Sequence, residues 1–171
     1  MKIQIIGYSG CGKSTLASLL AKKNSAPVLY LDRAHFLPGW RTRPANEREK
    51  IVLDFLNEND SWVIDGNYQK VLYERRLEEA DEIIFMNFNR FSCFCRAYRR
   101  YRTYKGKTRE SMTDGCEEKF DLAFMRWILR ESRTKQQKEK FKKVLAQYGS
   151  KTTVIRNQKE LSSYIRAKHL Q

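Results

Sequence analysis

The sequence predicts an α/β domain with a five-stranded parallel sheet flanked by helices. Short apolar runs alternate with stretches of helical periodicity along the 171 residues, which is the order typical of strand–helix crossovers. The first apolar run ends in a glycine-rich turn and a helical pattern follows at once, as in doubly wound sheets. A chain of this length buries enough surface to fold without disulfide staples. We therefore expect residues 1–171 to form a single domain.

Each predicted strand is a short apolar run that stops at a polar residue or a glycine. The first strand ends at Gly7, the second at Asp32 and the third at Asp65-Gly66. Two further runs rich in β-branched and aromatic residues complete the sheet. The five predicted strands cover residues 3–6, 28–31, 62–64, 82–86 and 152–155.

The predicted helices lie between and after these strands. In the first of them, Leu16, Leu19 and Leu20 fall on one face, which is the spacing of an amphipathic helix. Residues 105–116 contain two glycines and mixed polar residues, so we expect an exposed loop there. Trp62 and Trp127 are expected in the core. The predicted helices cover residues 13–23, 46–57, 70–77, 90–104, 117–133, 135–148 and 158–168.

The composition excludes several classes of protein. There is no run of about 18 apolar residues and no signal-peptide pattern, so we expect no membrane span and a cytoplasmic location. The four cysteines form no CxxC pair, which argues against a zinc site and favours free thiols. The net charge of +14 and the pI near 9.8 favour polyanionic partners such as nucleotides, nucleic acids or phosphorylated metabolites.

The glycine-rich turn after the first strand matches the P-loop pattern G-x-x-x-x-G-K-[ST]. In this pattern, backbone N–H groups and the N-terminus of the following helix surround the phosphates of a nucleotide. Lys13 is expected to reach the β- and γ-phosphates of ATP, and the Ser14 hydroxyl is expected to bind Mg²⁺. The residues predicted to bind the nucleotide are Gly7, Ser9, Gly10, Cys11, Gly12, Lys13, Ser14 and Thr15.

Asp32 and Asp65 each follow a predicted strand. Ligands of open α/β sheets bind at the carboxyl ends of the strands, so both side chains are expected to face the P-loop. One role open to them is to hold Mg²⁺, which we assign to Asp65 together with Ser14. The other is to orient or deprotonate an acceptor hydroxyl, which we assign to Asp32. The alternative is that each aspartate caps the next helix.

A basic segment is predicted to form a lid over the phosphates, at about residues 96–133. Half of the fourteen positions from 96 to 109 are Arg or Lys and none is acidic. Arg126, Arg130 and Arg133 have the spacing of one helical stripe. Such arginines would offset charge on a transferring phosphoryl group. Two alternatives remain open: a solvated face, and a nucleic-acid patch in which Tyr98, Tyr101 and Tyr104 stack on bases.

A second segment, at about residues 33–60, is expected to form a flap on the acceptor side. His35, Trp40 and Arg41 lie in the first part of this segment. They are expected to line the acceptor pocket, together with the turn that follows the third strand. The turn residues assigned to the acceptor pocket are Asp65, Gly66, Asn67 and Tyr68.

Several of these strings together resemble the bacterial topology modulation protein family, whose members are adenylate-kinase-like P-loop proteins. The most specific string is Trp-Val-Ile-Asp-Gly-Asn-Tyr at residues 62–68. The resemblance covers most of the chain. The other segments that carry it are residues 7–14, 31–32, 39–40, Arg75, residues 80–81 and residues 115–121, with the arginine-bearing stretch after them.

The resemblance implies roles for individual residues. Lys13 and Ser14 match the Walker A lysine and hydroxyl, and Asp65 resembles the Walker B aspartate. Residues 67–69 are Asn-Tyr-Gln where adenylate kinases carry Phe-Pro-Arg, so the arginine that grips a nucleoside monophosphate is missing. Asp32 resembles the aspartate of P-loop kinases that phosphorylate hydroxyl groups. The residues that resemble lid arginines are Arg96, Arg100, Arg130 and Arg133.

The predicted function is therefore an ATP-dependent, Mg²⁺-dependent phosphotransferase with a small hydroxyl-bearing or phosphorylated acceptor, which includes nucleosides and nucleotides. The alternative is a nucleic-acid-binding protein that uses nucleotide as a switch and affects DNA topology. The identity of the acceptor, the choice between ATP and GTP, and the oligomeric state stay open at this point.

Overall fold

A computed structural model describes residues 1–170 of the chain. Its five-stranded sheet is entirely parallel, with the order β2-β5-β1-β6-β7. The predicted sheet is thus confirmed, and every predicted strand is present. The strands are β1 (Lys2–Gly7), β2 (Val28–Tyr30), β5 (Trp62–Asp65), β6 (Glu82–Met86) and β7 (Thr152–Ile155).

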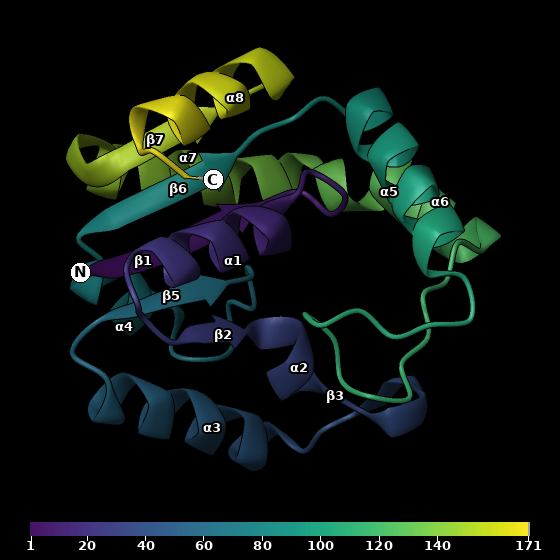
Figure 1. The fold of residues 1–171 in the computed structure, drawn as a ribbon, viewed down its shortest axis with the longest axis horizontal. Helices are drawn as coiled ribbons and strands as arrows, with labels where there is room; N and C mark the ends of the chain where they lie inside the picture. Colours follow the sequence, from purple (N-terminus) through teal and green to yellow (C-terminus); the bar gives the residue numbers. More distant parts are fainter. Residues whose placement is uncertain (171) are drawn as a thin grey trace.

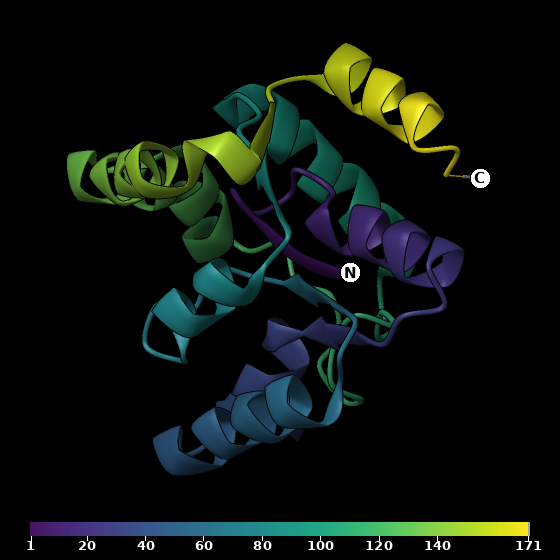
Figure 2. The same ribbon diagram turned by 90° about the vertical axis from the view of Figure 1, so that its left-hand side faces the viewer.

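Helices cover both faces of the sheet (Figures 1 and 2). The helices α1 and α8 lie on one face, and α3, α4 and α7 lie on the other. The helices α5 and α6 stand beyond the carboxyl ends of the strands (Figure 1). The helices are α1 (Lys13–Lys23), α2 (Leu31–His35), α3 (Ala45–Glu58), α4 (Tyr73–Glu79), α5 (Arg90–Tyr104), α6 (Leu122–Leu129), α7 (Lys135–Tyr148) and α8 (Gln158–Ala167).

The three central strands are buried on both faces, which explains their nearly continuous apolar sequence. All four residues of β5 are buried, and Trp62 at its start has no exposed surface. In the register, Ile5 of β1 lies beside Asp65 of β5, and Gly7 lies beside Met86 of β6. The end of β1 is therefore flanked on both sides, and the P-loop begins at the point where the strand order reverses.

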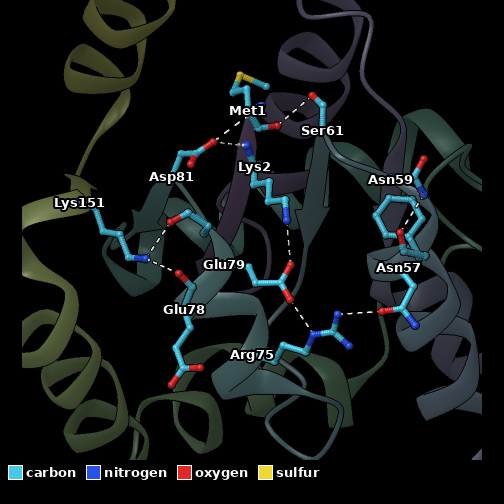
Figure 3. Close-up of polar contacts among 12 residues, drawn as sticks. Met1, Lys2, Asn57, Asn59, Ser61, Arg75, Glu78, Glu79, Asp81 and Lys151 are labelled. Carbon is cyan, nitrogen blue, oxygen red and sulfur yellow. Dashed lines mark hydrogen bonds and ion pairs between the residues drawn. The ribbon is translucent and has the colours of Figure 1, made fainter.

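At the end of the sheet opposite the P-loop, polar contacts join residues near the amino ends of the strands (Figure 3). The Lys2 ammonium contacts Glu79 at 2.9 Å, and Glu79 also accepts from Arg75 at 2.6 Å. The Lys151 ammonium donates to the carbonyls of Glu78 and Ala80 at 2.8 and 2.7 Å. This network ties β1 and the β7 region to the end of α4, far from the P-loop.

Two predictions for the arginine-bearing segment are wrong, and residues 36–42 contain an element that was not predicted. Residues 36–42 form a small antiparallel hairpin of β3 (Phe36–Leu37) and β4 (Arg41–Thr42), joined by a turn at Pro38–Trp40. The predicted helix at 117–133 is shorter: α6 begins at Leu122, where the Asp121 carboxylate caps the Phe124 N–H at 2.8 Å. Its end at Leu129 breaks the predicted stripe, so Arg130 and Arg133 lie outside the helix that carries Arg126.

Residues 105–121 run from α5 to α6 as turns and extended chain. The loop predicted for residues 105–116 is present, and it continues up to the cap of α6. Trp127 was expected in the core, but 40% of it is exposed, which corrects that prediction. No helix within residues 1–170 combines the length and the apolar character needed to cross a membrane.

Candidate active site

A cleft of about 780 Å³ lies at the carboxyl edge of the sheet. Its lining comes mainly from the P-loop, Asp32 and the flap, the turn after β5, and the chain from α5 through α6, with further residues from α4 and from the stretch between α6 and α7 into α7. The position agrees with the rule that open α/β sheets bind ligands beyond the strand ends, where the strand order reverses.

Two glycines allow the P-loop to pack closely at the N-terminus of α1, because a side chain would not fit at either position. Gly10 has φ +80°, and a Cβ there would overlap the carbonyl oxygen of Cys93 in α5. Gly12 has φ +98° and is the residue before α1, and a Cβ there would press on the guanidinium of Arg96. The loop therefore packs directly against α5, and this packing shapes the anion cradle.

Ser14 and Asp65, the two residues predicted to hold Mg²⁺, are in direct contact. The Ser14 hydroxyl donates to Asp65 Oδ2 at 2.6 Å. The other carboxylate oxygen, Asp65 Oδ1, is buried without a hydrogen-bond partner among the described residues. Burial raises the pKa of the Asp65 carboxyl, although Lys13 and the Ser14 hydroxyl act in the opposite direction. A buried, partly unsatisfied carboxylate beside a hydroxyl is a suitable donor set for a cation.

Lys13 lines the same cleft and is held by the P-loop itself. Its ammonium donates to the Tyr8 carbonyl at 3.0 Å. Burial works against the charged form of Lys13, but the nearby Cys11, Asp65 and Asp32 outweigh it and raise its pKa above the usual value. Lys13 is therefore a cation at neutral pH, as phosphate binding requires.

The Asn67 amide joins the P-loop to the turn after β5. Asn67 Oδ1 accepts from the Gly7 N–H at 2.9 Å, and Asn67 Nδ2 donates to the Gly7 carbonyl at 2.9 Å. The side chain thereby imitates a peptide group that pairs with the end of β1. The neighbouring Tyr68 is placed by the same turn.

Asp32 lies in the first turn of α2 and lines the cleft. Its Oδ1 accepts from the Tyr68 hydroxyl at 2.6 Å. Burial, together with Asp32, raises the pKa of Tyr68 far above its usual value, so the phenol stays protonated and acts as the donor. The ring of His35 packs on Tyr68 with centroids 4.6 Å apart, and His35 Nδ1 lies 2.9 Å from Arg48 Nη1.

The alternative role of these two aspartates as helix caps does not agree with the geometry. Tyr30 precedes α2, Leu72 precedes α4, and neither helix has a side-chain cap. Asp32 and Asp65 instead accept hydrogen bonds from Tyr68 and Ser14.

Arg100 and Arg109 both contact the buried carboxylate of Glu118. Arg100 Nη2 lies 2.6 Å from Glu118 Oε1, and Arg109 Nε lies 2.5 Å from Glu118 Oε2. The Glu118 side chain is only 4% exposed, and all three residues line the cleft. Burial, together with the charge of Arg109, lowers the pKa of Arg100, and Glu118 offsets part of this effect.

The other predicted arginines take different positions. Arg96 lines the cleft, lies over the Phe88 ring and donates to Gln158 at 2.5 Å. The Arg133 guanidinium stacks 3.7 Å from the centroid of the Tyr8 ring and donates to the Phe88 carbonyl at 2.8 Å. Arg133 thus packs against the P-loop through Tyr8. Arg130 is exposed and does not line the cleft.

Among the remaining predicted residues, Ser9, Thr15, Trp40 and Gly66 line the cleft. Cys11, His35 and Arg41 do not line it. Cys11 is fully buried beneath the P-loop, His35 lies behind Tyr68, and Arg41 points to the Pro38 carbonyl on the exposed hairpin.

Several lining residues were not predicted for the site. Arg109 was recognisable only as part of the basic run, and Glu118 only as part of a resembling string. The aromatic residues Phe36, Phe124 and Trp127 also line the cleft. Their sequence pattern looks the same as that of core residues, so no sequence signal marks them as part of the site.

The sequence matches no protein-family model and no curated protein. Among solved structures, the fold is similar to shikimate kinase from Bacteroides thetaiotaomicron, with a TM-score of 0.50 and 18% identity over 98% of this chain and 95% of that chain. It is also similar to a gluconokinase from Sinorhizobium meliloti 1021, with a TM-score of 0.50 and 17% identity over 96% of this chain and 87% of that chain. The chain therefore has the fold of the P-loop kinases.

Proposed function

We propose that this protein transfers the γ-phosphoryl group of ATP to a hydroxyl group of a small acceptor. The observation that carries the proposal is the Ser14–Asp65 contact at the P-loop, with the Asp32 carboxylate in the same cleft. These groups are a phosphate-side pair and an acceptor-side base, the two parts that phosphoryl transfer to a hydroxyl requires. The two similar solved structures are kinases by name, which supports the same class of reaction.

Each group has a defined task in this proposal. The P-loop N–H groups and Lys13 hold the β- and γ-phosphates. Asp32 accepts the proton of the acceptor hydroxyl, and Tyr68 fixes the orientation of that carboxylate through its 2.6 Å bond. Arg96 lines the cleft next to Gly12 of the P-loop and would offset negative charge on the transferring group, whereas Arg100 and Arg109 are paired with Glu118.

The residues present suit Mg²⁺. Ser14 and Asp65 would hold it, since Mg²⁺ prefers oxygen ligands and usually takes one or two carboxylates beside phosphates and water. No group of three or more His, Cys, Asp or Glu side chains suited to a metal occurs within residues 1–170. A bound Mg²⁺ would supply charge neutralisation at the β- and γ-phosphates.

The Lys13→Ala variant tests the proposal. We expect it to abolish phosphoryl transfer, measured as acceptor-dependent ADP release, because the phosphates lose their cation. The matched control is Lys22→Ala, which removes an exposed lysine from the same helix and should leave transfer unchanged. Far-UV circular dichroism checks that both variants keep the fold. Full transfer by a folded Lys13→Ala protein contradicts the proposal.

A second candidate function is nucleic-acid binding, in line with the resemblance to the topology modulation protein family. The C-terminal part of α5 and the loop after it expose Arg99, Arg102, Lys105 and Lys107 together with Tyr98 and Tyr104. Basic and aromatic side chains on one surface can bind phosphates and stack on bases.

A salt titration tests this second candidate. DNA affinity that falls steeply with salt, yet persists at about 0.15 M, supports it. An Arg99→Gln/Arg102→Gln variant should then bind more weakly and show a smaller salt slope. Negligible DNA binding at about 0.15 M salt removes this candidate.

A further inference from the structure

Aromatic rings form a large part of the acceptor end of the cleft. Phe36 and Trp40 come from the flap, and their ring centroids lie 5.2 Å apart. Phe124 and Trp127 come from α6, with nearly parallel rings at an interplanar angle of 12°. All four line the same cleft as Asp32. Flat apolar walls of this kind bind planar rings, because stacking is favourable for any aromatic ligand.

Charges at this end of the cleft balance. Its cations are Arg100, Arg109 and Lys119. Its carboxylates are Glu118, Asp32 and Asp121. Both arginines are already paired with Glu118, and the Lys119 ammonium lies 5.5 Å from the centroid of the Trp40 ring. The three carboxylates offset the three cations, so this end of the cleft has no net positive charge that would favour an acceptor bearing a phosphate or carboxylate group.

The loop at residues 113–117 is hydrogen-bonded to the flap at residues 36–40. The Gly39 N–H donates to the Gly115 carbonyl at 3.1 Å, and Trp40 Nε1 donates to the Glu117 carbonyl at 3.1 Å. The Thr113 hydroxyl donates to the Phe36 carbonyl at 2.7 Å. These contacts connect two of the segments that line the cleft, and its volume of about 780 Å³ suits a small molecule.

We propose that the acceptor is an uncharged molecule with a planar aromatic ring and a hydroxyl group, of the nucleoside class. This inference rests on the proposed function and adds the chemical class of its acceptor. The ring lies between the flap aromatics and those of α6, and the hydroxyl points to Asp32. The hydroxyl oxygen forms a bond to the γ-phosphorus, the bond between that phosphorus and the β,γ-bridging oxygen breaks, the proton passes to Asp32, and ADP leaves.

The first experiment compares acceptors in three matched groups. ADP release is measured with adenosine, guanosine, cytidine and thymidine, with the corresponding 5′-monophosphates, and with the non-aromatic hydroxyl compounds ribose and gluconate. We expect a nucleoside to be phosphorylated with a kcat/KM at least tenfold above that of its monophosphate and of both non-aromatic compounds. A monophosphate, ribose or gluconate as the best acceptor overturns the inference while leaving the proposed function in place.

The second experiment tests the aromatic walls. We expect Phe124→Leu and Trp127→Leu each to raise KM for the nucleoside about tenfold or more, because a lost base–aromatic stack changes binding by this order. KM for ATP should not change. The matched control is Leu122→Ala, which alters an 80% exposed residue of α6 outside the cleft. An unchanged nucleoside KM in both aromatic variants, or an equal rise in the control, contradicts the inference.

The third experiment separates the inference from the proposed function by measuring binding without ATP. Trp40 and Trp127 line the cleft whereas Trp62 is buried, so bound nucleoside should quench tryptophan fluorescence saturably. Saturable quenching without any ADP release supports the aromatic binding site and contradicts the proposed phosphoryl transfer. No quenching by any of the four nucleosides, or tighter binding of a single-stranded oligonucleotide than of the nucleosides, overturns the inference.

Discussion

Near Asp32, the protonation state of His35 follows from its neighbour Arg48, whose guanidinium can only donate hydrogen bonds. Arginine has no acceptor atom, so His35 Nδ1, 2.9 Å from Arg48 Nη1, must carry a lone pair and the proton must be on Nε2. Burial, with help from the Arg48 charge, lowers the pKa of His35 below its usual value. The ring that packs on Tyr68 is therefore neutral at pH 7.

This arrangement predicts a pH dependence of stability. Because the pKa of His35 is lower in the folded than in the unfolded chain, the unfolded chain gains a proton first as the pH falls. Stability is fully present above the unfolded value of 6.5 and is lost as the pH falls through the folded pKa. The free energy of unfolding, measured by urea denaturation at about pH 7.5 and about pH 5.5, should differ less between the two pH values in His35→Phe than in the wild type. His169→Gln should behave like the wild type, and an unchanged pH response in His35→Phe contradicts the assignment.

At the scale of elements, α4 is fixed by a buried cation that has no acidic partner within residues 1–170. Arg76 is fully buried and donates to Gln4 Oε1 at 2.9 Å and to the carbonyls of Val71 and Tyr68 at 3.0 and 2.9 Å. Burial lowers the pKa of Arg76 to about 10, so it remains charged at neutral pH. The guanidinium thus holds together β1, the start of α4 and the turn that carries Tyr68.

Removing this side chain should be costly. We expect Arg76→Leu to destabilise the fold by about 3 kcal/mol or more, because several buried acceptors lose their donors at once. Arg75→Ala is the matched control: Arg75 is the neighbouring residue but forms a part-exposed ion pair with Glu79, worth at most about 1 kcal/mol. Chemical denaturation measures both. Equal losses in the two variants contradict the role given to Arg76.

The elements differ in how far their sequence determines them. The strands were predictable because each is a short apolar run that ends at a polar residue or a glycine, and α1, α5 and α7 because of their helical periodicity. Residues 117–121 have helical propensity, yet Glu118 is drawn to Arg100 and Arg109, and Phe120 packs on Phe94 and Tyr101. These tertiary contacts hold the segment outside the helix, and no local pattern could reveal them.

The same distinction holds for the site. The P-loop and Asp65 were predictable because a motif and a strand end place them. The Tyr68–Asp32 bond joins two elements 36 residues apart, so spacing alone does not reveal it. The opposite side of the cleft depends on α6, whose first residue was misplaced. Trp127 was assigned to the core because large aromatic side chains are usually buried.

At the scale of the whole molecule, the net charge of +14 acts on stability. Five of the ten ion pairs within residues 1–170 join residues no more than five positions apart, and the excess cations repel one another. Folding brings these charges closer together than they are in the unfolded chain, so salt should favour the folded state by screening them.

Raising NaCl from low concentration to about 0.15 M should therefore increase the unfolding temperature by about 2–4 °C, the shift that corresponds to about 1 kcal/mol for a chain of this size. Differential scanning calorimetry measures the shift. Arg99→Gln/Arg102→Gln lowers the charge at exposed positions, so its response to salt should be smaller. An unfolding temperature that falls with salt would mean that attractive pairs dominate.

The double hydrogen bond between Asn67 and Gly7 affects the alignment of the two halves of the cleft. In the proposed reaction, one half would hold the donor phosphates, and the other carries Tyr68 and, through it, the orientation of Asp32. Because the Asn67 amide bonds directly to the last residue of β1, the spacing between the two halves is fixed at the end of that strand. The gap that the phosphoryl group would cross is therefore set by the backbone of β1.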